Sequence, residues 1–177
     1  MNNFYNKILE TCERLNINLT KYLIYVSICE QNLYLFCEGN LERVFQVSTS
    51  RAKPSCVKDS LGTPNGLHKI DGKIGAGEPL ETVFRARVAC GLVREQTPEE
   101  QAKNLITTRI MRLRGLEEGV NAGGDVDTYA RYVYIHGTNQ EDKIGTPNSH
   151  GCVLLKNAEV AQLFDIVNDG TIVLISD

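Results

Sequence analysis

The segment YVYIHGTNQEDKIGTPNSHGCVLLKN, residues 132–157, contains residue types suited to nucleophilic chemistry. It holds two of the three histidines and one of the six cysteines, and a single glycine separates His150 from Cys152. A cysteine attacks as its thiolate, which is only a few per cent of a free thiol near pH 7. A nearby imidazole can take the thiol proton. The pattern therefore predicts Cys152 as a nucleophile with His136 as its base.

The residues before the cysteine could orient this base. ARYVYIH, residues 130–136, alternates as a strand does, which places Tyr132, Tyr134 and His136 on one face. The loop that follows can return Cys152 to the strand end. The tautomer of His136 depends on what accepts its other N–H, and with Gly137 next in the sequence a backbone carbonyl could do so.

Gly151 lets the backbone turn sharply and approach a substrate closely. The amides of Gly151 and Cys152 could then face a developing oxyanion. Losing one such donor typically costs about 10²–10³ in rate. The SHGC sequence thus combines a nucleophile with candidate oxyanion donors.

Three other interpretations stay open on spacing alone. His136, His150 and Cys152 are acceptable ligands for zinc, which takes three protein ligands in catalytic sites, although His-x-Cys is not a usual chelating unit. The histidine and cysteine could instead be satisfied core residues without chemistry. A redox thiol is the third reading, but no resolving cysteine lies nearby in the sequence.

The rest of the chain predicts a mostly β domain with minor α structure. We expect an amphipathic helix over 3–15, an antiparallel meander over 22–47, strands at 67–70, 82–90, 105–115 and 171–176, and a helical turn at 97–105. Asn157 is a possible cap for a helix that stops at Asn-Asp-Gly, residues 168–170. The expected architecture is a sandwich or partly closed barrel, with a helical segment at 1–21 and the catalytic domain at 22–177.

Composition excludes several classes of protein. The formal net charge of −3 gives no electrostatic footprint for nucleic acid. The apolar stretch YLIYVSIC is too short to span a membrane, and no secretory signal is recognisable, so we expect a cytoplasmic protein with free thiols. We expect neither a metal nor a cofactor.

HGTNQEDKIGTPNSHGC resembles the signature of the L,D-transpeptidase catalytic domain (YkuD-like) family. The resemblance extends over about residues 22–177, including VSICEQNLYLFCEGNLERVFQVSTS and LGTPNGLHKI. It implies a β-sandwich-like fold, Cys152 as the acyl-enzyme nucleophile, His136 as the base and the Gly137 carbonyl as its orienting group. Gly151 and Cys152 amides, with His150, would form the oxyanion hole, and Ser149 and His150 would shape the loop.

The resemblance and the residue pattern also bear on positions outside the motif. Asn157 falls at a matching position of the family, Tyr132 and Tyr134 could line the cleft, and all three are candidate substrate-binding residues. The family usually has arginine two residues after the cysteine, where this chain has Leu154. One of Arg109, Arg112 and Arg114 could replace that arginine in space. His68 is expected to be a half-exposed strand residue.

The resemblance implies a substrate from peptidoglycan, a stem tetrapeptide cleaved between diaminopimelate (or lysine) and the terminal D-alanine through a Cys152 thioester. Because no leader is recognisable, we favour hydrolysis of a soluble muropeptide, an L,D-carboxypeptidase reaction in peptidoglycan recycling. The alternative is transpeptidation to 3–3 cross-links. A further alternative is a non-catalytic binding module, because Leu154 replaces the arginine. Carbapenem-type inhibitors are possible partners by the same resemblance.

Overall fold

A mixed sheet of ten strands is the main feature of the computed structural model, which describes residues 3–177. The strands are β1 (Tyr22–Ser27), β2 (Asn32–Cys37), β3 (Asn40–Gln46), β4 (Gly66–Ile74), β5 (Thr82–Arg85), β6 (Val88–Leu92), β7 (Ile106–Gly115), β8 (Tyr134–Gly137), β9 (Val153–Leu155) and β10 (Ile172–Ser176). The helices are α1 (Asn3–Arg14), α2 (Pro98–Gln101) and α3 (Asn157–Ile166), with short 3-10 helices η1 (Val93–Glu95), η2 (Gly124–Val126) and η3 (Glu141–Lys143).

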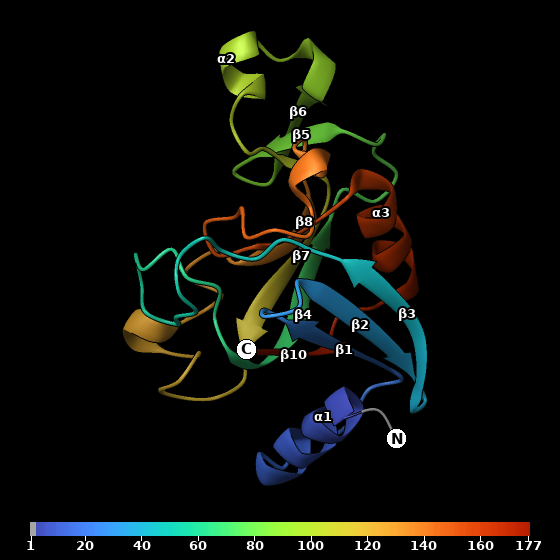
Figure 1. Cartoon of the computed structure of the whole chain (residues 1–177), viewed down its shortest axis with the longest axis vertical. Coiled ribbons are helices and arrows are strands. Elements are labelled where there is room, and N and C mark those ends of the chain that lie inside the picture. The colour runs from blue at the N-terminus through green and yellow to red at the C-terminus, as the bar shows by residue number, and fades with distance from the viewer. Residues whose placement is uncertain (1–2) are drawn as a thin grey trace.

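The N-terminal third folds as its residue pattern predicts. In α1, Ile8 and Cys12 lie one turn apart and are buried against β1, where the ring of Phe4 stacks on Tyr25 at 4.5 Å between centroids. Strands β1, β2 and β3 then form the predicted antiparallel meander. The helix lies at one end of the molecule, below these strands in Figure 1.

The sheet nearly closes on itself. Its order is β3-β2-β1-β10-β4-β7-β5-β6, while β8 branches from β7 and β9 pairs with β8. Just after β3, Ser48 forms an isolated bridge with Leu154 of β9, with N···O distances of 3.0 and 2.9 Å. The expected mostly β fold is confirmed, as an unclosed sheet in which the segment after β3 contacts the branch strand β9 beside residue 152.

The two faces of β8 and β9 have different surroundings. Ile135, Val153 and Leu155 are buried in the main apolar core, and α3 covers β7 and β8 on this side. Because side chains alternate along a strand, His136 and Leu154 point to the opposite face. The core thus fixes both strands, and the other face is left for the site.

Four expectations about the elements were wrong in detail. Tyr132 has φ +57° and lies in a turn, because β8 begins only at Tyr134. Residues 82–90 form the β5–β6 hairpin, which lies with α2 at the end of the molecule opposite α1 (Figure 1). The three-residue β9 was not expected. Asn157 is not a cap but the first residue of α3, preceded by Lys156.

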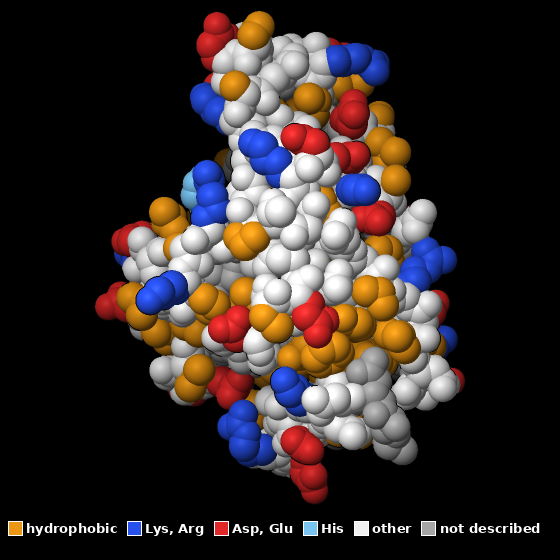
Figure 2. Space-filling view, in the orientation of Figure 1, with side chains coloured by type: hydrophobic (Ala, Val, Ile, Leu, Met, Phe, Trp, Pro, Cys, Tyr) orange, Lys and Arg blue, Asp and Glu red, His pale blue; other side chains and the backbone are white. Residues whose placement is uncertain are grey.

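Basic and acidic side chains are interspersed over the face shown in Figure 2. Within residues 3–177, no helix is both long enough and apolar enough to cross a bilayer.

Candidate active site

Parallel pairing of β8 with β9 brings the predicted nucleophile and base to one place. His136 is the register partner of Leu154, and Cys152 directly precedes β9. The backbone N–H of Tyr134 donates to Cys152 Sγ at 3.4 Å, which continues this register. Cys152 and His136 both line a cavity of about 180 Å³. The sulfur and the imidazole therefore share a space that a small reactant can enter.

The imidazole of His136 is buried and held in one tautomer. Its Nδ1 lies 2.7 Å from the carbonyl oxygen of Gly137. A carbonyl oxygen can only accept, so Nδ1 carries the hydrogen and Nε2 of the neutral ring is an acceptor. Burial lowers the pKa of His136 to about 4, although the bond to Gly137 acts in the opposite direction. Near neutral pH the ring is uncharged, as a general base must be.

Asn157 fixes the strand that carries the base. It is 5% exposed and lines neither of the cavities beside Cys152. Its side chain accepts hydrogen bonds from Thr107 and Thr108 and donates to the Thr138 carbonyl and Glu141. A Cβ on Gly137 would lie 2.7 Å from Asn157 Oδ1, so only glycine fits beside it. The structure thus gives Asn157 a supporting place, where the sequence suggested a substrate contact.

The thiol of Cys152 is protonated in the resting structure. Burial raises its pKa to about 11, while the Tyr134 amide and the charge of Arg131 lower it. A resting thiolate paired with imidazolium, the activated form considered from sequence, is therefore not the state shown. His136 is buried and Cys152 partly buried, and desolvation favours the neutral form of both side chains.

A compact turn presents the nucleophile. Ser149 Oγ donates to the Cys152 carbonyl at 2.6 Å and accepts from the Gly151 amide at 3.1 Å. Gly151 has φ +124°, a conformation that side-chain-bearing residues rarely adopt. In this turn the Gly151 amide is occupied, whereas the Cys152 amide donates to no acceptor of residues 149–152. Of the two amides expected as oxyanion donors, that of Gly151 already has an acceptor within the turn.

His150 is an exposed residue at the mouth of the site. It lines both cavities, and its Nε2 lies 3.2 Å from Arg51 Nη2. In Figure 2 a histidine (pale blue) is visible against basic side chains.

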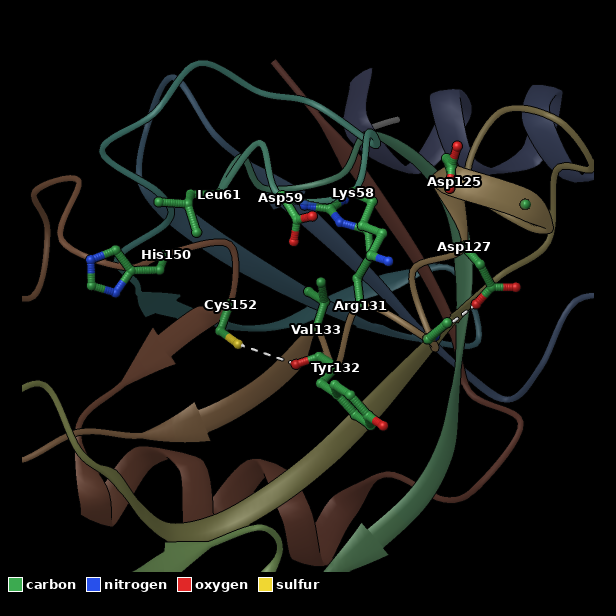
Figure 3. A pocket seen from close by; sticks show the side chains of 12 residues that line it. Lys58, Asp59, Leu61, Asp125, Asp127, Arg131, Tyr132, Val133, His150 and Cys152 are labelled. Atoms are coloured by element: carbon green, nitrogen blue, oxygen red, sulfur yellow. Dashed lines mark hydrogen bonds between the residues drawn. The ribbon is translucent and has the colours of Figure 1, made fainter.

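A larger cavity of about 390 Å³ opens on the other side of the sulfur. Figure 3 shows Cys152 and His150 at one end and Arg131 and Tyr132 along its length. Charged side chains of both signs line it: Lys58, Asp59, Asp125, Asp127 and Arg131. Cys152 therefore lies between an open polar cavity and the smaller one that contains its base.

The two tyrosines separate in the structure. Tyr132 is 55% exposed and lines the larger cavity, where its carbonyl lies 3.8 Å from Cys152 Sγ. Tyr134 is 4% exposed and its hydroxyl accepts from Arg87 Nη1 at 3.3 Å. The shared face expected from alternation was wrong, because the chain turns at Tyr132.

The arginine beside the nucleophile is not one of the three considered from sequence. Arg109 donates to the carbonyls of Glu78 and Thr108. The guanidinium carbons of Arg112 and Arg114 lie 3.7 and 3.8 Å from the ring centroid of Tyr129. Arg131, which lines the larger cavity with Cys152, was missed, since nothing in its sequence neighbourhood indicates that two distant loops meet there.

The metal site and the placement of His68 can also be compared with the structure. Within residues 3–177, no cluster of three or more His, Cys, Asp or Glu side chains is arranged to hold a metal ion. His68, expected to be half exposed, is fully buried between the Gly66 carbonyl at 2.9 Å and Thr128 Oγ1 at 3.1 Å. Its place in the core explains why it contributes nothing to either cavity.

Comparison with known proteins places this geometry in context. Residues 21–175 match the model of the YkuD family, the L,D-transpeptidase catalytic domain. The chain is similar to YqjB of Bacillus subtilis (strain 168), at 46% identity over 50 residues, which is 28% of either chain.

Solved structures share the fold. An L,D-transpeptidase from Mycobacterium smegmatis superposes with a TM-score of 0.56 at 18% identity over 89% of this chain and 59% of that one. The L,D-transpeptidase LdtMt1 in complex with imipenem gives 0.54 at 19% identity, over 88% and 59%. This chain thus spans about three fifths of the length of those structures.

Proposed function

Because the chain belongs to the L,D-transpeptidase catalytic domain family, we propose that it is a cysteine acyl-transfer enzyme acting on peptidoglycan stem tetrapeptides. The observation that carries the proposal is the shared cavity of Cys152 and His136, with Nε2 of the imidazole as its free acceptor. The bond cleaved would be the one between the third residue, diaminopimelate or lysine, and the terminal D-alanine.

The first half-reaction forms a thioester. His136 Nε2 takes the thiol proton as Cys152 Sγ attacks the carbonyl carbon of the third residue. The Cys152 amide donates to the oxyanion of the tetrahedral intermediate. The intermediate collapses as His136 returns the proton to the leaving nitrogen, and D-alanine departs as an amine.

The second half-reaction depends on the acceptor, and we favour water. The acceptor must lose its proton to His136, so it must enter the smaller cavity. The cavity of about 180 Å³ has ample room for water. A second stem peptide has far less room there. This supports L,D-carboxypeptidase action on a soluble muropeptide, as in peptidoglycan recycling; a cytoplasmic location remains a prediction.

Transpeptidation to 3–3 cross-links is the second candidate, because the smaller cavity is open to solvent and an amine could reach the thioester from outside. Incubation of the purified protein with disaccharide-tetrapeptide, followed by mass analysis, separates the two. We expect tripeptide and D-alanine without cross-linked dimer. Abundant dimer would show that the acceptor is an amine.

A non-catalytic binding module is the third candidate, since Leu154 stands where the family has arginine. The matched variants Cys152→Ala and Cys56→Ala distinguish it from an enzyme. We expect Cys152→Ala to bind the tetrapeptide but not to cleave it, and Cys56→Ala to keep its turnover. An imipenem complex exists for LdtMt1, so we also expect a carbapenem to acylate Cys152. If the wild-type protein binds tetrapeptide but neither cleaves it nor reacts with the carbapenem, it is a binding module.

A further inference from the structure

Arg131 is a cation without an acidic partner beside the nucleophile. It belongs to the turn that leads into β8 and is partly buried. Its Nη1 donates to the Ser55 carbonyl at 3.0 Å, and its Nη2 to the Gly62 carbonyl at 2.8 Å and to Ser60 Oγ at 3.4 Å. All three acceptors are neutral, and no salt bridge in the described chain includes Arg131. Its charge is therefore not cancelled by an ion pair.

The same guanidinium holds a loop against the nucleophile turn. Residues 55–62 receive its hydrogen bonds, and this loop contacts Gly151, where a Cβ would lie 3.3 Å from the Gly62 carbonyl. Ser50 Oγ holds the loop from the other side by donating to the Leu61 carbonyl at 2.6 Å. The cation is thus fixed relative to the turn that contains Cys152.

Of the charged groups around the Cys152 sulfur, Arg131 is the one that bears on the ionisation of the thiol. His136 is neutral, and Asp127 is occupied by the amides of Gly123 and Ala130. The remaining groups around the cavity that titrate or carry charge are Tyr132, His150, Lys58, Asp59 and Asp125, and the Asp59 carboxylate acts on the charge of Arg131 without forming an ion pair with it. Of these cavity side chains, Arg131 is the one whose field lowers the pKa of the Cys152 thiol. In a partly buried site such a field is screened much less than in water.

We propose that the guanidinium of Arg131 stabilises the developing thiolate of Cys152. Leu154 is 1% exposed and apolar, and no described Lys or Arg lines the smaller cavity, which contains His136. Arg131 supplies the positive charge from the opposite, larger cavity. The inference rests on the proposed function only in that Cys152 is the nucleophile.

The test measures the thiol without any peptide substrate. The rate at which iodoacetamide, a neutral reagent, alkylates Cys152 is followed against pH by mass analysis of the Cys152 peptide, because the chain has six free cysteines. A nearby opposite charge typically lowers the pKa of an acidic group by about 1–3 units, so removing a cation raises the thiol pKa. We expect Arg131→Met to move the profile by about one unit to higher pH, so alkylation is about tenfold slower at each pH below the midpoint.

Three variants separate charge from structure. Arg131→Lys keeps the charge and should restore most of the rate. Ser50→Ala loosens the same loop but keeps the charge, so it should shift the profile by less than Arg131→Met does. Arg87→Met removes a neighbouring arginine, which contacts Tyr132 and Tyr134, and should leave the profile in place. If Arg131→Met does not fold by circular dichroism, Arg131→Gln, which can still donate to Gly62, takes its place.

The proposal is overturned if the neutral variant alkylates like the wild type. It is also overturned if Arg131→Lys is as slow as Arg131→Met, or if Ser50→Ala or Arg87→Met shifts the profile equally. Failure of peptide cleavage by the wild-type protein would contradict the proposed reaction but would leave this measurement interpretable. The two inferences can therefore fail separately.

Discussion

Nδ1 of His136 lies 2.7 Å from the carbonyl oxygen of Gly137, the next residue along β8. Base and orienting group thus come from consecutive residues of one strand, and no separate acidic side chain is needed. The bond to this carbonyl raises the pKa of His136, but burial lowers it by more and keeps the imidazole neutral. The reaction should therefore begin from an uncharged pair.

The pH profile of kcat/KM should reflect that uncharged pair. With the pKa of His136 at about 4 and that of Cys152 at about 11, both groups stay neutral between these values. We expect kcat/KM for tetrapeptide cleavage to be nearly flat from about pH 5 to about pH 10 and to fall below about pH 4, as His136 takes a proton. An acid limb with its midpoint near the ordinary histidine value would contradict this.

Gly151→Ala should damage the nucleophile turn. The residue has φ +124°, and the new Cβ would lie 3.3 Å from the Gly62 carbonyl. We expect a loss of about 1–3 kcal/mol in the free energy of unfolding and at least tenfold slower thioester formation. Gly119→Ala is the matched control, since Gly119 also has positive φ but no atom near its Cβ position. Equal effects of the two variants would show that backbone strain alone is responsible.

Asn157→Ala should lower stability more than its single missing amide suggests. The change leaves two threonine hydroxyls and a backbone carbonyl of the buried network without a partner. Each buried unsatisfied group costs about 1–3 kcal/mol, so we expect a total loss of about 3 kcal/mol or more in urea unfolding. Gln162→Ala, on the exposed face of the same helix, should change stability by less than about 1 kcal/mol. A similar loss in both variants would contradict a supporting role for Asn157.

Restoring the family arginine at position 154 should harm the protein. Leu154 is 1% exposed and pairs with both His136 and Ser48, and no described Asp or Glu lines the cavity that it borders. Burying an unpaired guanidinium costs several kcal/mol, so we expect Leu154→Arg to lower the melting temperature and slow catalysis. Leu154→Met conserves volume and should cost less than about 1.5 kcal/mol. Faster catalysis by Leu154→Arg would show that the site lacks only that cation.

Two buried histidines should make folding sensitive to mild acid. Burial lowers the pKa of His68 to about 4, as it does for His136. Between about pH 6.5 and about pH 4 the unfolded chain binds protons that the native protein does not, so stability falls as pH falls, by about 3 kcal/mol for each histidine. Above about pH 6.5 the free energy of unfolding should not depend on the protonation of these two histidines.

Urea unfolding at about pH 7.5 and about pH 4.5 checks this expectation. The loss of stability between the two conditions should be about 2–3 kcal/mol smaller in His68→Gln than in the wild type. His150→Gln, which alters an exposed ring, should lose as much as the wild type. Equal losses in all three proteins would contradict a neutral, buried His68.

The sequence predicted the elements whose residues repeat with a clear period. The helix at 3–14, the meander over 22–46 and the long strand at 106–115 follow from apolar spacing, because each buries one face. Strand β9 has only Val153, Leu154 and Leu155, which show no alternation. Its existence depends on partners from two distant segments, β8 and Ser48.

The sequence predicted those candidate site residues that lie in the single segment 132–157. Cys152, Gly151 and His136 could be named from residue type and spacing, and their roles remain predictions. Arg131 could not be named, because its importance comes from loop 55–62, which lies more than sixty residues earlier in the chain. Tyr132 was placed wrongly because one residue with positive φ ends the alternation before β8.

The bridge between Ser48 and Leu154 joins an early part of the chain to a late one beside the reactive sulfur. Until those two segments meet, β9, which directly follows Cys152, is paired with β8 but not with Ser48. A nascent or truncated polypeptide would therefore contain an ordinary thiol, and reactivity would arise only once nearly the entire length had been assembled.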